Sequence, residues 1–392
     1  MQNKNTNGGK IVPNTEATFK ISSQFDSGNI RCLTGEGPGN IRLEINKDNG
    51  SDFYQWFYYR LSGVKNQTCV MTIENAKGAA FEDAWDGYNA CASYDGNDWF
   101  RVPTEYENGE LIISHTPEHD SVFYAFFAPY TMQRHLEFIG RLQMHPAVNL
   151  SILGQTLDGQ DMDLLTIGEP GKDKKNIWVI ARQHPGESMA EWWMEGFLER
   201  LLNSDDPVAR ELREKCVFYV VPNMNPDGSK RGHLRTNACG ANLNREWTVA
   251  TMERSPEVLL VMKHMDKTGV DFCLDVHGDE ALPYNFIAAA DGVDKFDDVH
   301  AKRLVKFLQA YKDATPEFQT KHGYAVDAPG TADLTMCTNY VAQAHNCLAM
   351  TLEMPFKDNA DLPDAHAGWS TKRCAKLGED VLDAMLAVWN DL

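Results

Sequence analysis

The chain has 392 residues, of which 43% are apolar and 24% charged, and its formal net charge is −19. This length exceeds what one hydrophobic core usually serves, so we expect two domains. The negative charge argues against nucleic acid and anionic membranes as partners, because phosphates would be repelled over most of the surface.

The start of the chain and the cysteines indicate the compartment. No apolar run approaches the roughly 18 to 20 residues that span a bilayer, and the opening MQNKNTNGGK lacks the apolar core of a secretory signal. Nine cysteines without any CxxC pair suit a reducing compartment better than a disulfide framework. We therefore predict a cytoplasmic protein with a polar N-terminal tail over residues 1–14.

Short aromatic and β-branched stretches separated by turn signals occupy residues 15–128. Examples are 53–61, 111–114 and 122–127, with Asp-Gly, Asn-Gly and Ser-Gly pairs between such stretches. This alternation of strand-forming runs and turns is typical of all-β domains. It predicts an antiparallel β-sandwich domain at the front of the chain.

Residues 129–392 have a different pattern, in which strand-like apolar runs alternate with helical periods. Such alternation is typical of an α/β layer fold. The last helix is expected over roughly 371–390. The predicted buried strands are 177–181, 216–221, 272–276 and 348–352.

Candidate metal ligands follow two of these strands. His184 and Glu187 lie in HPGE just past the first predicted strand, and His277 directly follows 272–276 in DVHG. A zinc hydrolase takes three ligands from His and Asp or Glu and leaves a fourth position for water. Functional sites of α/β sheets lie at the carboxyl ends of the strands. The pattern therefore favours a zinc site.

Spacing alone does not decide this assignment, because a His followed three residues later by Glu should arise about once by chance among twelve histidines. His115 and Glu118 have the same spacing. They lie in a turn of the β-rich region with no third ligand nearby, so we expect them to be solvated. For His184 and Glu187 a surface pair remains the alternative, and for His277 a hydrogen-bonded core histidine.

Three further residues have the chemistry that a hydrolytic site needs. Asn244 and Arg245 lie in GANLNREW, and an arginine beside an amide binds a carboxylate with geometric selectivity. Glu353 ends the apolar run 348–353, where a charge is costly unless it is used or paired. Such a carboxylate can accept the proton of a metal-activated water. The alternatives are a solvated loop and a strand-end glutamate at the surface.

These residues, in this order, resemble the zinc metallocarboxypeptidase family over roughly 130–392. HPGE, the NPDG turn, GHLRTNACGANLNREW, DVHG and the leading WFYYRLSG and FFAPYT resemble the cytosolic carboxypeptidase subgroup over nearly the whole chain. The resemblance implies an α/β fold, with a mixed-sheet zinc carboxypeptidase domain behind the β-sandwich. It also implies one zinc ion per chain, held by His184, Glu187 and His277, and a peptide or protein C-terminus as substrate.

The resemblance also assigns roles around the metal. Glu353 would be the general base, and Arg235 would polarise the scissile carbonyl and stabilise its oxyanion. Asn244 and Arg245 would hold the terminal carboxylate. The mobile tyrosine of the family falls near Tyr324, with Tyr340 as a competing candidate.

Substrate specificity is the point at which the sequence departs from the subgroup. Its members commonly have Gly-Thr-Ala-Arg before the catalytic glutamate, and that arginine is thought to bind an acidic side chain. Here the segment ends in Asp333, which would repel glutamate and attract lysine or arginine. Acidic specificity, implied by the subgroup, and basic specificity, suggested by Asp333, both stay open.

Two other functions remain as alternatives. One is a zinc aminoacylase-type deacylase, because those enzymes share an HxxE pair and a distant His, although they are generally smaller and lack the aromatic front domain. The other is a catalytically inactive binding protein, against which every catalytic position is filled with the required residue type. The sequence does not indicate the oligomeric state.

Overall fold

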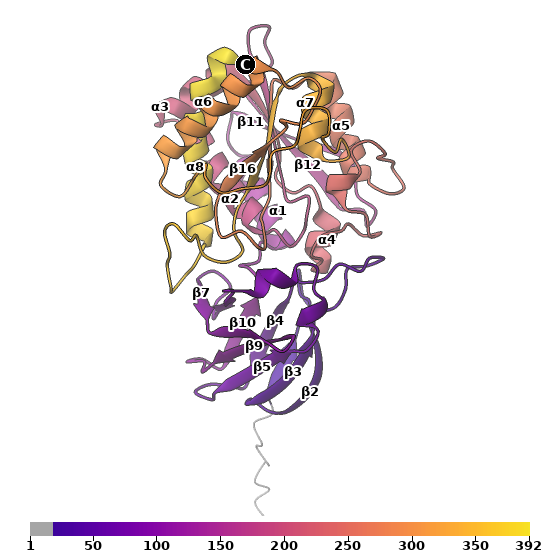
Figure 1. Cartoon of the computed structure of the whole chain (residues 1–392), viewed down its shortest axis with the longest axis vertical. Helices are drawn as coiled ribbons and strands as arrows, with labels where there is room; N and C mark the ends of the chain where they lie inside the picture. Colours follow the sequence, from indigo (N-terminus) through magenta and orange to yellow (C-terminus); the bar gives the residue numbers. More distant parts are fainter. Residues whose placement is uncertain (1–18) are drawn as a thin grey trace, which may run out of the picture.

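The computed structural model describes residues 19–392, so the predicted tail over 1–14 lies outside the described residues. Figure 1 shows an all-β half and an α/β half stacked along the long axis of the molecule. The predicted division into 15–128 and 129–392 stays a prediction. None of the helices within 19–392 combines the length and hydropathy needed to cross a membrane.

The front half consists of two five-stranded sheets that share a core. Tyr59 of one sheet places its hydroxyl 3.2 Å from the sulfur of Met71 in the other. The first sheet has the order β1 (Lys20–Ser22), β4 (Tyr58–Ser62), β10 (Ser121–Ala125), β6 (Ala90–Ser93) and β7 (Trp99–Val102). The second has the order β2 (Arg31–Gly37), β3 (Asn40–Glu44), β5 (Cys69–Ile73), β9 (Glu110–His115) and β8 (Thr104–Glu107).

The predicted β-sandwich is confirmed with two corrections. β3 and β5 pair in parallel, because the chain between them passes through β4 of the other sheet instead of turning back in a hairpin. The predicted strand 53–61 is wrong in its first half, since β4 begins at Tyr58. Before it, the Gln55 amide pairs with the backbone of Phe81, and the Trp56 indole donates to the Ser27 carbonyl. These contacts hold residues 53–57 in place without the backbone pairing of a β-strand.

The α/β half is built on a seven-stranded mixed sheet. The four central strands run parallel and are buried almost throughout, which is why they read as continuous apolar runs. All four strands predicted from the sequence are confirmed as β13, β14, β15 and β17. The order is β11 (Val148–Gln155), β12 (Asp161–Ile167), β14 (Cys216–Val221), β13 (Lys175–Ala181), β15 (Phe272–Val276), β17 (Leu348–Glu353) and β16 (Phe286–Ala289).

Helices cover both faces of this sheet (Figure 1). Alternate residues of β13 point to opposite faces, so Val179 packs in the core under one group of helices and Trp178 under the other. The first group is α1 (Met132–Leu142), α2 (Met189–Leu202), α3 (Pro207–Lys215), α6 (Asp298–Ala314) and α8 (Thr371–Val388). The second is α5 (Pro256–Thr268) and α7 (Cys337–His345).

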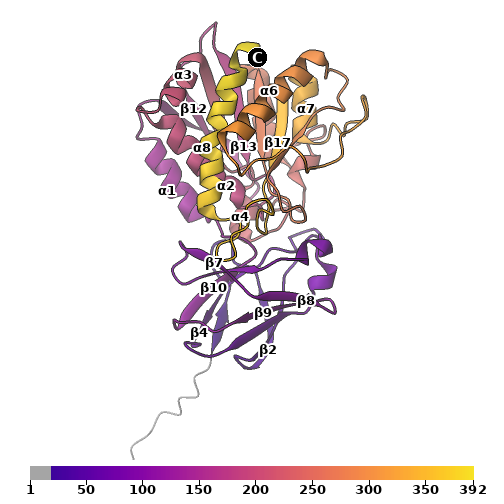
Figure 2. The same cartoon turned by 60° about the vertical axis from the view of Figure 1, so that its left-hand side comes forward.

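The predicted last helix is confirmed as α8, which lies along α2 (Figure 2). Glycine makes this close approach possible: a Cβ added at Gly196 would lie 1.9 Å from the carbonyl oxygen of Ala375. The helix ends at Val388 and is followed by a 3₁₀ turn over Trp389–Asp391.

The two halves share one hydrophobic core. Phe126 of the β half stacks on Phe356 of the α/β half, with 4.5 Å between the ring centroids. The Arg101 guanidinium donates to the carbonyl oxygens of Phe356, Lys357 and Trp369. All nine cysteines are unpaired, and most of them are buried.

Candidate active site

The first two candidate ligands lie on a strained turn after β13. Arg182 adopts a left-handed φ of 60°, which for a residue other than glycine costs on the order of 1 to 3 kcal/mol. Its buried side chain holds the turn, because Nε donates to the Pro185 carbonyl at 2.9 Å and Nη1 to the Tyr130 carbonyl at 2.6 Å. The contacts of Arg182, two positions before His184, therefore fix the turn that carries His184 and Glu187.

A buried row of alternating charges lies behind this turn. Arg182 pairs with Glu191, whose other carboxylate oxygen lies 2.8 Å from Nδ1 of His135. Nε2 of His135 lies 3.1 Å from the Asp163 carboxylate. Burial alone would lower the pKa of His135, but the two carboxylates outweigh it and raise the pKa to about 9. The two positive groups, Arg182 and His135, therefore alternate with two carboxylates, and the buried charges balance one another.

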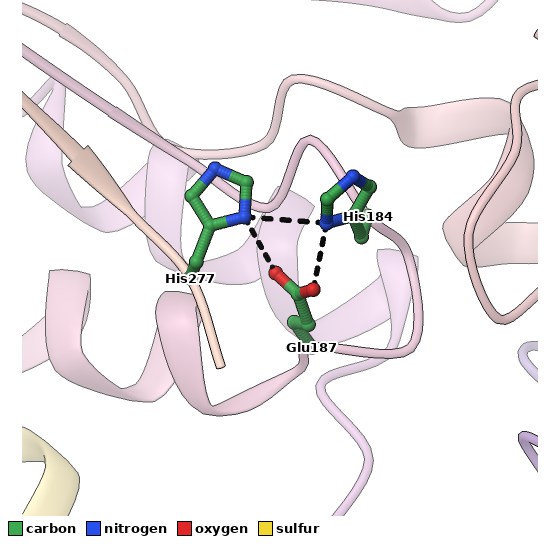
Figure 3. Close-up of side chains that lie close together, drawn as sticks. All are labelled: His184, Glu187 and His277. Atoms are coloured by element: carbon green, nitrogen blue, oxygen red, sulfur yellow. Dashed lines mark hydrogen bonds and ion pairs between the residues drawn. The ribbon is translucent and has the colours of Figure 1, made fainter. Parts of the chain in front are cut away.

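The third candidate ligand comes from the neighbouring strand. β15 pairs in parallel with β13, so His277 at the end of β15 lies beside the turn after β13. Figure 3 shows the three side chains pointing at one another. Nδ1 of His184 lies 2.6 Å from one oxygen of Glu187, Nδ1 of His277 lies 2.8 Å from the other, and the two nitrogens are 3.2 Å apart.

This arrangement fits a zinc ion. Nε2 of His277 lies 2.9 Å from the Asp275 carboxylate, and Nε2 of His184 lies 3.0 Å from the amide oxygen of Asn242. Each histidine can therefore keep its proton on Nε2 and turn a lone pair on Nδ1 toward the carboxylate of Glu187. Three electron-pair donors that face one another need a cation between them, and two His with one Glu form a common catalytic zinc set.

The two histidines differ in protonation. At His277 burial is outweighed by the carboxylates of Asp275 and Glu187, which raise its pKa well above the ordinary value, so His277 must release a proton when a metal binds. His184 needs no such step, because burial, followed by the positive charge of Arg235, lowers its pKa to about 4. The imidazole of His184 is therefore neutral at physiological pH, which is the form that binds a metal.

A cavity of about 300 Å³ opens on the three ligands. It brings together residues that lie far apart in the sequence, from Phe81 in the β half to Glu353 at the end of β17. The predicted site residues that line it are His184, Glu187, Arg235, Asn244, Arg245, His277, Tyr324 and Glu353.

Glu353 lies at the carboxyl end of β17, beside the ligand from β15. It is buried, and its Oε2 has no hydrogen-bond partner among the described residues. Burial raises its pKa well above the ordinary value, and the Glu187 carboxylate adds to the rise while His277 opposes it. The alternative of a surface glutamate is therefore wrong, and an unpaired buried carboxylate is left facing the cavity.

Asn244 and Arg245 lie on the 3₁₀ turn η3 (Leu243–Arg245). The Asn244 side-chain oxygen accepts from the backbone N–H of Cys337 at 2.8 Å, which leaves its NH₂ group for other partners. The Arg245 guanidinium donates to the Asn244 carbonyl at 2.6 Å. Both side chains thus present donors to the cavity.

Tyr324 and Asp333 differ in their placement. Tyr324 lines the cavity and donates its hydroxyl to Asp279 at 2.6 Å, whereas its competitor Tyr340 packs beside Trp247 away from the cavity. Asp333 does not line the cavity. Its exposed carboxylate accepts from the backbone and hydroxyl of Thr335 and lies 3.9 Å from the Arg245 guanidinium.

Two family models match the chain. Residues 21–127 match the cytosolic carboxypeptidase N-terminal domain, and residues 136–367, more than half of the chain, match zinc carboxypeptidase. The chain belongs to the zinc carboxypeptidase family. Its membership makes it a zinc-dependent hydrolase and argues against both alternatives, the deacylase and the inactive binding protein.

Individual relatives agree with this carboxypeptidase assignment. The solved structure of a metallo-carboxypeptidase from Burkholderia cenocepacia is 48% identical, with a TM-score of 0.92 and with 95% of this chain and 99% of that chain covered. A metallo-carboxypeptidase from Pseudomonas aeruginosa, in complex with (2-guanidinoethylmercapto)succinic acid, is 42% identical, with a TM-score of 0.93 and the same coverage. Cytosolic carboxypeptidase 4 of Mus musculus is 30% identical over 65% of this chain, and the match spans 27% of that longer protein.

Several residues of this carboxypeptidase site were not anticipated from the sequence. Asp279 and Glu280 add two carboxylates to the cavity, and Phe81 reaches it from the β half. Burial and the nearby Glu187 carboxylate raise the pKa of Glu280 well above its ordinary value. Asp275, which contacts Nε2 of His277, was also not anticipated, although the sequence holds a signal for it. Residues two positions apart in a strand point to the same face, so Asp275 could have been predicted to lie beside His277.

The pair His115 and Glu118 takes no part in the carboxypeptidase site. His115 ends β9 and is half-buried, with Nδ1 at 2.8 Å from the Tyr124 hydroxyl, so the expectation that it is solvated was wrong. The ring is covered because it packs among aromatic side chains of the sandwich, whereas Glu118 is exposed. Within residues 19–392 the only cluster able to hold a metal is that of His184, Glu187 and His277.

Proposed function

We propose that the chain removes C-terminal residues from peptides, with His184, Glu187 and His277 holding one zinc ion and Glu353 as the general base. The observation that supports this most is the single cavity, in which a buried His-Glu-His cluster faces an unpartnered carboxylate. We also propose a cytoplasmic location, in keeping with the unpaired cysteines and the cytosolic subgroup.

Substrate would be held by its terminal carboxylate. Arg245 offers a planar fork of N–H donors, and the free NH₂ of Asn244 lies on the same turn. These donors bind the C-terminal end of the substrate peptide, so that its last peptide bond lies over the metal ligands. A substrate without a free carboxylate would not form this ion pair with Arg245 and would bind more weakly.

The chemistry would be shared between the metal and three side chains. Zinc, when bound, supplies a Lewis acid that polarises the carbonyl and makes water a better nucleophile. Glu353 accepts the proton of the attacking water and passes it to the leaving amine. Arg235 donates to the carbonyl oxygen as negative charge grows there. Tyr324 closes over the bound residue.

We further propose a preference for C-terminal lysine or arginine. A second cavity of about 340 Å³ adjoins the first, with Tyr324 in the wall of both, and Asp291 and Asp327 line it. The Pseudomonas relative was solved with a compound that has a guanidine at one end and a dicarboxylate at the other. Asp333 stays a candidate for the same preference, although its carboxylate lies at the rim beside Arg245.

The test is a comparison of kcat/KM on blocked peptides ending in Lys, Leu and Glu. We expect the zinc enzyme to prefer Lys, and expect Asp291→Asn to reduce that preference by about fivefold or more, since an ion pair retaining 1 kcal/mol is worth about that factor. A loss in Asp333→Asn alone would assign the specificity to Asp333 instead. Efficient release of Glu by the wild type would exclude the basic preference, and no release from any of the three peptides would exclude the function.

A further inference from the structure

We propose that the β half of the molecule positions Arg235 of the active site, with Asp48 as the main positioning residue. The inference rests on the proposed role of Arg235. It gives the front domain a part in turnover, although none of the predicted metal ligands or catalytic groups comes from it.

The Asp48 carboxylate binds the backbone N–H groups of Arg235 and its two neighbours. It is buried, and Oδ1 accepts from the N–H of Leu234 at 2.7 Å, while Oδ2 accepts from the N–H of Arg235 at 2.8 Å. Oδ2 also accepts from both the N–H and the hydroxyl of Thr236, at 2.9 and 3.1 Å. Hydrogen bonds to a charged acceptor are roughly twice as strong as neutral ones, so three consecutive residues are fixed by one carboxylate.

Asp48 is itself held in place by its own loop. Its N–H donates to the Phe53 carbonyl at 2.9 Å, and its carbonyl accepts from the N–H of Ser51. The next residue, Asn49, contacts His233 through both its backbone N–H and its side-chain oxygen, at 3.1 and 2.7 Å. The β half therefore holds the loop from 233 to 236 at two adjacent points.

The side chain of Arg235 is supported by aromatic rings from the same half. The guanidinium carbon lies 5.7 Å from the ring centre of Phe53 and 5.4 Å from that of Phe81. Cation–π contacts of this kind orient the group without using its N–H donors. No hydrogen bond from the guanidinium to residues 19–392 is found, so its N–H groups are available to donate to a substrate oxygen.

The same loop also contacts the turn that bears two metal ligands. The Leu234 carbonyl accepts from the N–H of Gly186 at 2.8 Å, between His184 and Glu187. A Cβ at Gly186 would lie 2.9 Å from this carbonyl oxygen, so the approach depends on glycine. Asp48 thus fixes Arg235 relative to the metal ligands and not only relative to the β half.

Asp48→Asn should misplace Arg235 while leaving the substrate carboxylate site intact. An amide has one oxygen where the carboxylate has two, so its NH₂ group would face at least one of the backbone donors. A shift of about 1 Å at a catalytic group can cost on the order of 100-fold in rate. Because Arg235 acts on charge that develops in the transition state, kcat should fall and KM should change little.

The decisive experiment is a double-mutant cycle on the zinc-loaded enzyme. We expect Asp48→Asn to lower kcat by about tenfold or more in the wild type and by less than about twofold in Arg235→Ala, because its effect acts through that arginine. An equal loss in both backgrounds, or no loss in the wild type, would overturn the inference while leaving the proposed function standing. Unchanged kcat in Arg235→Ala would remove the role of Arg235 itself, and with it the inference.

Two further variants guard against a merely structural effect. Asp52→Asn makes the same chemical change four residues away, on a carboxylate that is exposed and bonds only Lys47, so it should leave kcat unchanged. If Asp48→Asn does not fold, Phe81→Leu removes a ring from beside the guanidinium. It should lower kcat several-fold only when Arg235 is present, with zinc content unchanged, and an equal loss in Arg235→Ala would count against the proposal.

Discussion

His135 should make the protein less stable as the pH rises through about 9. Both ring nitrogens face carboxylates, of Glu191 at 2.8 Å and of Asp163 at 3.1 Å. A neutral imidazole could donate to only one of them, so the folded protein favours the doubly protonated ring. This preference raises the pKa of His135 to about 9 in the folded state, despite the opposing effect of burial.

The size of the effect follows from this shift. In the unfolded chain the pKa returns to about 6.5, so the folded value is higher by about 2.5 units. At about 1.36 kcal/mol per unit, the proton contributes on the order of 3 kcal/mol to the free energy of unfolding. Because the folded pKa is the higher one, this contribution is fully present below about pH 6.5 and is lost as the pH rises through 9.

The assay is urea unfolding of the zinc-loaded wild type and of His135→Gln between pH 6 and pH 10. The difference between the two proteins at each pH cancels the contributions of other titrating groups that the substitution leaves alone. We expect the advantage of the wild type to shrink by about 3 kcal/mol over this range. An advantage that is the same at both ends would refute the charged state of His135.

Three further outcomes are expected. His184→Ala and His277→Ala should each abolish stoichiometric zinc binding in elemental analysis, and full retention in both would contradict the ligand assignment. Glu353→Gln should retain fold and zinc but lose about 10² to 10⁴ in kcat, so a wild-type rate would exclude it as the base. Gly186→Ala should lower thermal stability and zinc affinity, because its Cβ meets a carbonyl oxygen at 2.9 Å. The matched Gly140→Ala, inside α1 with no atom within 4 Å, should raise stability by about 0.5 to 1 kcal/mol, and the opposite order would refute this reading of the two glycines.

The α/β half was predictable because its strands are buried on both faces. The runs 216–221 and 272–276 coincide with β14 and β15, since an uninterrupted apolar run can only fit the centre of such a sheet. The sandwich was less predictable. The aromatic run 53–61 has strand composition throughout, but Gln55 and Trp56 bond to distant backbone groups, and nothing local marks where the ladder begins.

The same distinction holds for the site. His184 and His277 could be found because polar residues directly after buried strands are few, and the sheet brings those strand ends together. Asp48 could not be found, because its partner Leu234 is 186 positions away and its own neighbours form an ordinary polar turn. Nor could Phe81, whose place in the cavity wall depends on how the two halves dock.

The contacts of Arg101 bear on how the chain could be shortened. A fragment beginning at residue 129 would lack Arg101, which donates to the carbonyls of Phe356, Lys357 and Trp369. It would also lack Phe126, so the ring of Phe356 would be exposed to water. Unsatisfied carbonyls and an uncovered aromatic ring favour aggregation over folding. Protease cuts near residue 128 should therefore yield two pieces that stay together or precipitate, and trimming is a poor route to a minimal enzyme.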